Sequence, residues 1–183
     1  MNDPPDELSE HPDLADTSAA MRATWRAEQD AATRDAVEDW AHRQTLVDRL
    51  RAHMHRGDDL TVTVAGHRLV GTVEEVGPDL LAIRASSGRV DVHLTPTIPL
   101  RFEVSTRATE GGHRGSDAAG GRFRTALIAR EQDGSVTLGT IDERDGINGV
   151  LVGGADHVLL RRADGRELVV PTRDVAWISP SRR

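Results

Sequence analysis

The spacing of apolar residues along the chain changes from a helical period to a strand period at about residue 60. Between Ser18 and Arg56 no Pro or Gly interrupts the chain, and Ala, Arg, Glu and Gln, which are good helix formers, predominate. The apolar residues that recur close to every 3.6 positions are Met21, Trp25, Ala32, Ala36, Val37 and Trp40, followed by Leu46, Val47, Leu50 and Met54. Ser18 is a suitable N-cap, and Gly57 is a natural residue to end a helix. The pattern predicts one long amphipathic helix over 18–56.

The apolar stripe of this helix has two interpretations. It can pack on the protein's own core, or it can face a partner protein or a second copy of the chain. A helix that projects from a small domain cannot easily bury two tryptophans on that domain. The candidate partner face comprises Trp25, Val37 and Trp40, and both interpretations stay open.

From Leu60 onward apolar and polar residues alternate. Five short runs end in turn residues such as Gly66, Gly77-Pro78-Asp79 and Ser87-Gly88, which is typical of a small barrel. Residues 105–121 contain five glycines and predict a flexible linker. A short helical pattern from Arg122 to Glu131 follows, and strand patterns resume at Val136. Residues 1–17, rich in Pro and acids, predict a disordered acidic tail.

Turn residues recur at a constant offset along the chain. Gly77, Asp79 and Arg84 have counterparts 77 positions later at Gly154, Asp156 and Arg161, and Gly88 and Arg89 match Gly165 and Arg166. Such a recurrence indicates a duplicated unit, because turn chemistry fixes the register of the strands around it. The predicted fold is mainly β with a helical N-terminal extension. It has two tandem five-stranded barrels, over 57–104 and 122–179, each preceded by a helix.

The segment Val62-Thr63-Val64-Ala65-Gly66-His67-Arg68-Leu69-Val70-Gly71-Thr72-Val73 resembles the Sm-like family of small SH3-type barrels. The resemblance covers roughly 45–104 and, more weakly, 122–179. The layout is also similar to a group of actinobacterial proteins with a helix and two such barrels. The resemblance implies ring-forming barrels that bind single-stranded RNA through two loops. The family's Met-Asn and Arg-Gly loop pairs are absent here, where the loops are Gly77-Pro78-Asp79, Thr95-Pro96-Thr97, Gly154-Ala155-Asp156 and Pro171-Thr172-Arg173.

Charge is distributed unevenly and limits the choice of partner. The net charge is −7, and residues 1–60 alone hold 14 acids against 7 arginines. The rest of the chain is close to neutral and has no basic stripe, and aromatic residues make up only 3%; both features disfavour a general nucleic-acid binder. Nucleic acid remains the alternative partner if the barrel arginines cluster. These candidates are Arg84, Arg89, Arg161, Arg162, Arg166 and Arg173.

No residue constellation predicts catalysis, a cofactor or a metal site. Cysteine is absent, and His53 and His55, two apart on a helix, point about 200° apart. No apolar run reaches the roughly 18 residues of a membrane span, and the N-terminus is acidic. We therefore expect a cytoplasmic, non-enzymatic interaction or scaffold module without a membrane or small-molecule partner. Self-association through barrel edges and the N-terminal helix is expected, and an Sm-like RNA- or DNA-binding regulator is the alternative.

Overall fold

The computed structural model describes residues 12–95, 97–106, 120–143 and 145–181, apart from the side chains of 12–19 and 106. The chain divides into two compact units, Met1–Gln44 and Thr45–Arg183. The predicted acidic tail over 1–17 lies partly outside the described residues, and most of the predicted linker over 105–121 does as well.

The first unit contains the helix α1 (Pro12–Arg43). It begins before Ser18, so residues 12–17 of the predicted tail are helical. Its apolar stripe is interrupted by charge, because Asp39 lies five turns beyond Met21 and Arg43 five turns beyond Trp25, on the same lines of the helix. Asp39 and Arg43 form an exposed ion pair with an N–O distance of 3.2 Å.

The predicted single helix over 18–56 is wrong, because the chain breaks between α1 and α2 (Leu46–Arg56). Thr45 is extended and caps α2: its hydroxyl accepts a bond from the Asp48 N–H, and the Asp48 carboxylate accepts one from the Thr45 N–H. The predicted end at Gly57 is confirmed, with the left-handed φ of 71° that favours glycine. Helical periodicity alone does not reveal this capping box.

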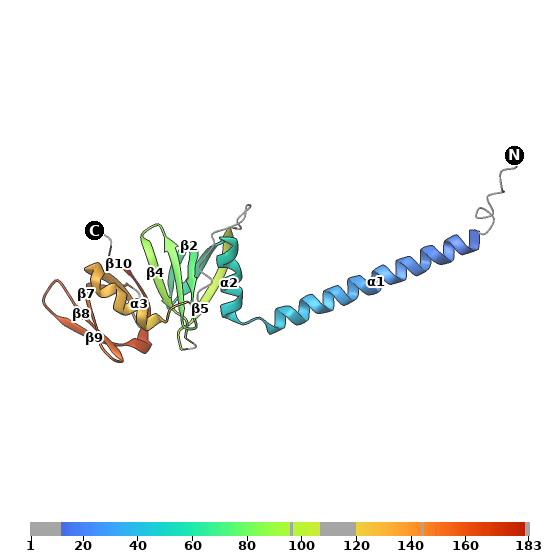
Figure 1. Ribbon diagram of the computed structural model, residues 1–183. Helices are drawn as coiled ribbons and strands as arrows, with labels where there is room; N and C mark the ends of the chain where they lie inside the picture. Colours follow the sequence, from blue (N-terminus) through green and yellow to red (C-terminus); the bar gives the residue numbers. More distant parts are fainter. Residues whose placement is uncertain (1–11, 96, 107–119, 144, 182–183) are drawn as a thin grey trace. The chain divides into compact units, whose positions relative to one another are not determined.

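The second unit is built on a ten-stranded antiparallel sheet (Figure 1). Its strands are β1 (Asp59–Val64), β2 (His67–Val76), β3 (Leu80–Ala85), β4 (Gly88–His93), β5 (Leu100–Thr106), β6 (Ser135–Thr140), β7 (Ile147–Gly153), β8 (His157–Arg161), β9 (Glu167–Pro171) and β10 (Val175–Pro180). The helix α3 (Phe123–Ala129) and the short 3-10 turn η2 (Arg130–Asp133) precede β6, and the 3-10 turn η3 (Thr172–Asp174) precedes β10.

The strand order repeats. It runs β5-β1-β2-β3-β4 and continues β10-β6-β7-β8-β9, so both halves place their fifth strand first. We call α2 with β1–β5 the first repeat, and α3 with η2, β6–β10 and η3 the second repeat. The prediction of a mainly β protein, with a helix before each group of five strands, is confirmed.

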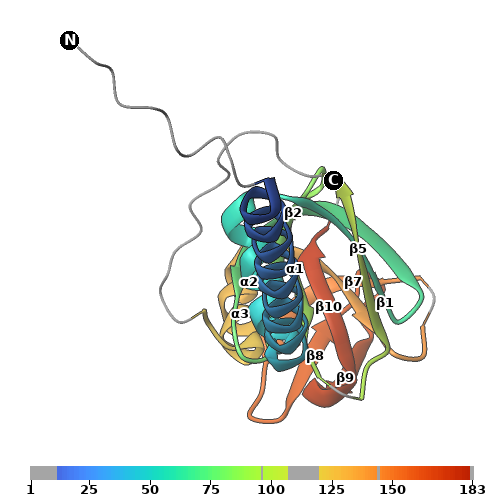
Figure 2. The same ribbon diagram turned by 90° about the vertical axis from the view of Figure 1, so that its right-hand side faces the viewer.

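The prediction of two tandem five-stranded barrels is not confirmed, because among the described residues the sheet is open and continuous. β4 of the first repeat pairs with β10 of the second, so β10 lies inside the sheet (Figure 1, Figure 2). The sequence pattern within each repeat could not predict this link, since strand pairing between distant segments leaves no local signal.

Strand pairing refines the repeat alignment. In the first repeat Arg84 lies opposite Arg89, whereas in the second Arg161 lies opposite Glu167. The second turn is therefore one residue longer, and the matches of Gly88 and Arg89 at an offset of 77 are wrong. Beyond this turn the equivalent residues are 78 positions apart.

Two hydrophobic cores occupy opposite faces of the sheet at the junction of the repeats. Trp177 of β10 belongs to the first core, with Leu50 and Met54 of α2. The next residue, Ile178, belongs to the second core, with Phe123 of α3. Successive strand residues point to opposite faces, so β10 contributes to both cores and joins the repeats by side chains as well as by its backbone.

Candidate functional site

The candidate site is the junction between the two repeats, where β4 of the first repeat pairs with β10 of the second. Val92 of β4 lies opposite Trp177 of β10, and Asp91 lies opposite Ile178. Val92 is fully buried and Trp177 is 7% exposed. The edge of one repeat is therefore covered by the fifth strand of the next.

The helix α3 closes one side of this junction. The Phe123 ring stacks on the His93 ring of β4, with centroids 4.3 Å apart and planes 5° from parallel. The Nδ1–H of His93 donates to the carbonyl oxygen of Val175 at 3.1 Å. Burial lowers the pKa of His93 below its ordinary value, although the bond to Val175 opposes this shift. Burial between the repeats therefore favours the neutral form of the imidazole.

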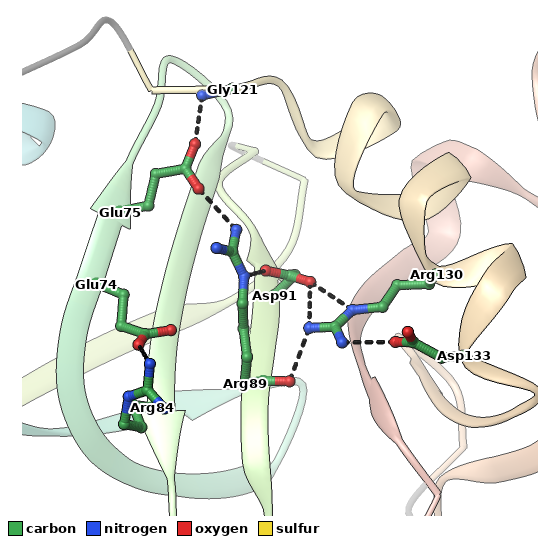
Figure 3. Close-up of polar contacts among 8 residues, drawn as sticks. All are labelled: Glu74, Glu75, Arg84, Arg89, Asp91, Gly121, Arg130 and Asp133. Atoms are coloured by element: carbon green, nitrogen blue, oxygen red, sulfur yellow. Dashed lines mark hydrogen bonds and ion pairs between the residues drawn. The ribbon is translucent and has the colours of Figure 1, made fainter. Parts of the chain in front are cut away.

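A buried carboxylate anchors η2 to β4 (Figure 3). Asp91 is 1% exposed and accepts bonds from Arg89 Nε and Arg130 Nε, each at 2.8 Å. Arg130 also donates to the carbonyl of Arg89 at 2.9 Å and to Asp133 at 2.7 Å. Charge-assisted bonds of this kind stabilise only where every partner is satisfied. Here the carboxylate holds one guanidinium from each repeat.

The network continues to the end of the linker. Glu75 of β2 accepts a bond from the Gly121 N–H at 2.6 Å and another from Arg89 at 2.7 Å. These bonds, the first above all, lower the pKa of Glu75, so the carboxylate stays ionised. Gly77 lies so close to Gly121 that a Cβ at Gly77 would clash with the Gly121 carbonyl. The chain therefore enters α3 pressed against β2.

A cavity of about 350 Å³ opens beside this network, lined by Glu75, Arg89, Asp91, Arg122, Arg130 and Asp133 among others. Arg89 and Arg130 form ion pairs with acids that line the same cavity. Its charged groups serve the joint between the repeats.

The corresponding edge of the second repeat is formed by β9, which no further strand covers within the described part of the chain. Leu81 lies opposite Val92 in the first repeat, and Val158 lies opposite Val170 in the second. Val169 is therefore the equivalent of Asp91. Asp91 is 1% exposed, whereas Val169 is 59% exposed. Among the described residues β9 pairs only with β8.

An apolar row crosses the exposed face of the second repeat. Val152 of β7 lies opposite Leu159 of β8, which lies opposite Val169 of β9. Val150 and Val152 are 45% and 44% exposed. We call Val150, Val152, Leu159 and Val169 the β9 face. Its counterparts in the first repeat include Ala82 and Asp91, both covered at the junction.

The opposite end of the sheet is the edge of β5. Among the described residues β5 pairs only with β1. Val62 of β1 lies opposite Phe102, and its counterpart Leu138 of β6 lies opposite Ile178. Phe102 therefore corresponds to Ile178, and β5 to β10, the strand that covers β4. β5 and β9 lie at opposite ends of the unit in Figure 1.

The predicted partner face lies on α1. Trp25, Val37 and Trp40 are 66%, 59% and 63% exposed. The other half of the predicted stripe separates from them, because Leu50 and Met54 of α2 are buried in the first core. The two interpretations of the stripe thus apply to different helices: α2 packs on the protein's own core, and the α1 face stays exposed.

The six candidate arginines lie on two hairpins and on η3, and five of them pair with acids. Arg84 pairs with Glu74, Arg89 with Glu75 and Asp91, Arg161 with Glu167, Arg166 with Asp164, and Arg173 with Asp174. Arg162 is exposed, and no ion pair of its side chain is seen among the described residues. Arg166 and Arg173 flank β9 at its two ends. Each of these five arginines therefore has an acidic partner.

One sequence pattern indicates that the β9 edge is unusual. Leu168-Val169-Val170 is apolar at every position, which is typical of a strand covered on both faces and unusual for a free edge. No such sequence pattern marks Asp91, His93, Phe123 or Arg130, because their roles depend on the contact between the repeats.

Within the described part of the chain, no helix is long and apolar enough to cross a membrane, and no group of three metal-ligating side chains is found. Comparisons of the chain with protein-family models, with curated proteins and with solved structures found no match in any of the three.

Proposed function

We propose that this protein is a non-enzymatic interaction or scaffold module whose barrel-like repeats associate through their strand edges. The observation that carries the proposal is the pairing of β4 with β10. One repeat already serves there as the binding partner of the other, through backbone bonds and a shared core. Strand addition of this kind is a recurrent mode of protein recognition.

The α1 helix supplies a second attachment point in this proposal. Trp25 and Trp40 expose large rings, and tryptophans are enriched among residues that dominate protein interfaces. A helix that offers such side chains to solvent suits recognition of another protein surface.

The alternative is an Sm-like protein that binds RNA or DNA. Phosphate binding draws on unpaired cations, whereas five of the six candidate arginines pair with acids. Trp177, an aromatic residue of the second repeat, is buried in the first core and is not available for base stacking. These features favour the interaction module. Membership of the Sm-like family stays a prediction.

Light scattering of the full chain, with and without mixed-sequence single-stranded RNA at low and moderate salt, tests the proposal. We expect a molar mass that RNA changes at neither salt. A mass increase with RNA that fades as salt rises would contradict the proposal and favour the nucleic-acid alternative, because phosphate contacts weaken with salt.

A further inference from the structure

We infer that α1 binds α1 of a second copy of this chain as an antiparallel pair, with Trp25 of each copy seated in a groove around Ala36 of the other. This contact rests on the proposed function, in which α1 is an attachment point for another protein. It involves the side chains of α1 alone.

The helix α1 carries an apolar face that nothing covers among the described residues. Of the side chains described on α1, the large apolar ones are all at least 59% exposed: Met21, Trp25, Val37 and Trp40. A helix in a protein draws most of its stability from packing such a face against another surface. Exposed apolar patches commonly mark interaction sites. We therefore expect α1 to have a packing partner.

The middle of this face is hollow. Ala32 and Ala36 lie seven and eleven residues after Trp25, which places both within about 20° of it around the helix. Their small side chains form the floor of a groove of about 540 Å³, which is lined by Gln29, Ala32, Thr33, Ala36, Val37 and Trp40. The same face therefore presents a large side chain and, beside it, a hollow that can receive one.

One antiparallel register joins these features. The apolar stretch of α1 runs from Met21 to Trp40, so full overlap of two copies sets Met21 of one opposite Trp40 of the other. In the same register Trp25 lies opposite Ala36, in the groove. The two-fold symmetry of such a pair makes each contact twice. Large side chains thus meet small ones along the whole contact.

The charges of α1 fit this register. It brings Arg22 level with Asp39 of the other copy, and Arg26 level with Asp35, so cations lie near anions along the pair. A parallel pair with the same overlap would set Asp35 and Asp39 beside their own copies. It would also set Trp25 against Trp25 and leave the groove empty. Charge and shape therefore favour the antiparallel arrangement.

The area of this contact suits a small specific interface. Trp25 and Trp40 are 66% and 63% exposed, so the four indoles of a pair contribute on the order of 500 Å² of buried surface. Met21, Val37 and the alanine floor bring the total towards the roughly 1,200 Å² at the lower end of stable interfaces. We therefore expect a dimer that dissociates on dilution.

Ala36→Glu tests the groove in the full-length protein. The side chain is exposed in the single chain and glutamate is a good helix former, so the variant folds. In the pair, however, its carboxylate would lose water against the electron-rich face of Trp25. Sedimentation over a concentration series should show a dissociation constant raised at least about tenfold over the wild type.

The matched control is Ala27→Glu. Ala27 is an exposed alanine nine residues before Ala36, and so it lies on the opposite side of α1. The substitution adds the same charge to the same helix away from the groove. This variant should dimerise like the wild type.

A spin label tests the orientation, because the chain has no cysteine of its own. His42→Cys places one label near the end of α1. In the antiparallel register the two labels of a dimer lie about 35 Å apart along the helix axis, from the 1.5 Å rise per residue. In a parallel pair they would lie within about 20 Å. Pulsed electron paramagnetic resonance should give the longer distance.

Four outcomes overturn this contact, and they differ in what they leave. A wild-type monomer at every concentration, unchanged by RNA, refutes the second copy and leaves the proposed module with another protein partner. Association that Ala36→Glu does not weaken, or that Ala27→Glu weakens equally, refutes this face and leaves self-association by another surface. The shorter label distance refutes the antiparallel arrangement. A mass that rises only with RNA contradicts the proposed function as well.

Discussion

At the residue scale, His93 shows how one side chain serves two repeats. It belongs to β4 of the first repeat, stacks on Phe123 of the second, and donates to the Val175 carbonyl. Its charged form is disfavoured by burial, so the pKa is lowered. Because the unfolded chain binds the proton more readily, His93 adds stability above its unfolded pKa of about 6.5 and loses it as pH falls through the lower folded pKa.

We expect His93→Phe to reduce the pH dependence of stability in the acid range. Phenylalanine preserves stacking on Phe123 but does not titrate. Urea unfolding at several pH values between about 5 and 7.5 should show a free energy of unfolding that falls less steeply with acid than in the wild type. Parallel pH profiles for the two proteins would contradict this role.

Another residue-scale prediction concerns Asp91. Its removal in Asp91→Ala leaves two guanidinium groups without their shared carboxylate, and Arg130 has a side chain only 11% exposed. We expect the free energy of unfolding to fall by about 3 kcal/mol, as when one partner of a buried ion pair is removed.

The matched control for Asp91→Ala is Asp133→Ala. Asp133 bonds the same Arg130 but its side chain is 34% exposed, so its loss should cost under about 1 kcal/mol. Equal effects of the two variants in denaturant unfolding would refute the central position of Asp91.

At the element scale, caps decide where the helices end. Periodicity and composition predicted helix over most of 18–56, and Gly57 predicted its end correctly. The break at Thr45 follows from hydrogen bonds that compete with the continuing helix: Thr45 and Asp48 satisfy each other's backbone N–H groups. The spacing of Thr45 and Asp48 ahead of an apolar run is itself a sequence pattern of a capping box, which helical periodicity does not reveal.

Thr45→Ala should destabilise the second unit by about 1 kcal/mol through loss of the α2 cap. Thermal or urea unfolding of the full chain measures the effect. The control is Thr33→Ala in α1, where the hydroxyl donates to the exposed carbonyl of Gln29 in the same helix; we expect little change in the main transition. A similar loss for both variants would mean that the cap adds nothing specific.

The strands show the same difference between features set by neighbouring residues and features set by distant ones. The hairpins are local, and their turn residues located them in the sequence: Ala65 and Gly66 have φ of 47° and 82°, as a two-residue hairpin turn needs. Which strand lies beside β4 is not a local matter. β10 pairs with β6 of its own repeat and also with β4 of the first repeat.

At the scale of the whole molecule, the sheet and α1 form separate compact units. We expect a chain lacking residues 1–44 to unfold within a few degrees of the full-length protein, since Thr45 still caps α2. Differential scanning calorimetry measures this. A large drop in the melting temperature would mean that α1 stabilises the sheet.

The sequence by itself determined what depends on neighbours along the chain: the helix-rich start, the change to period two near Leu60, the turns around Gly66 and Gly77, and the duplication of the pattern. Side-chain type and spacing set backbone preferences over a few residues, so these features can be read locally. The tertiary structure decided the rest. Residues far apart in sequence are joined by the pairing of β4 with β10, by the two cores on opposite faces and by the Asp91 network. Only contacts in three dimensions decide that β10 covers the β4 edge, whereas among the described residues no strand covers the equivalent edge of β9.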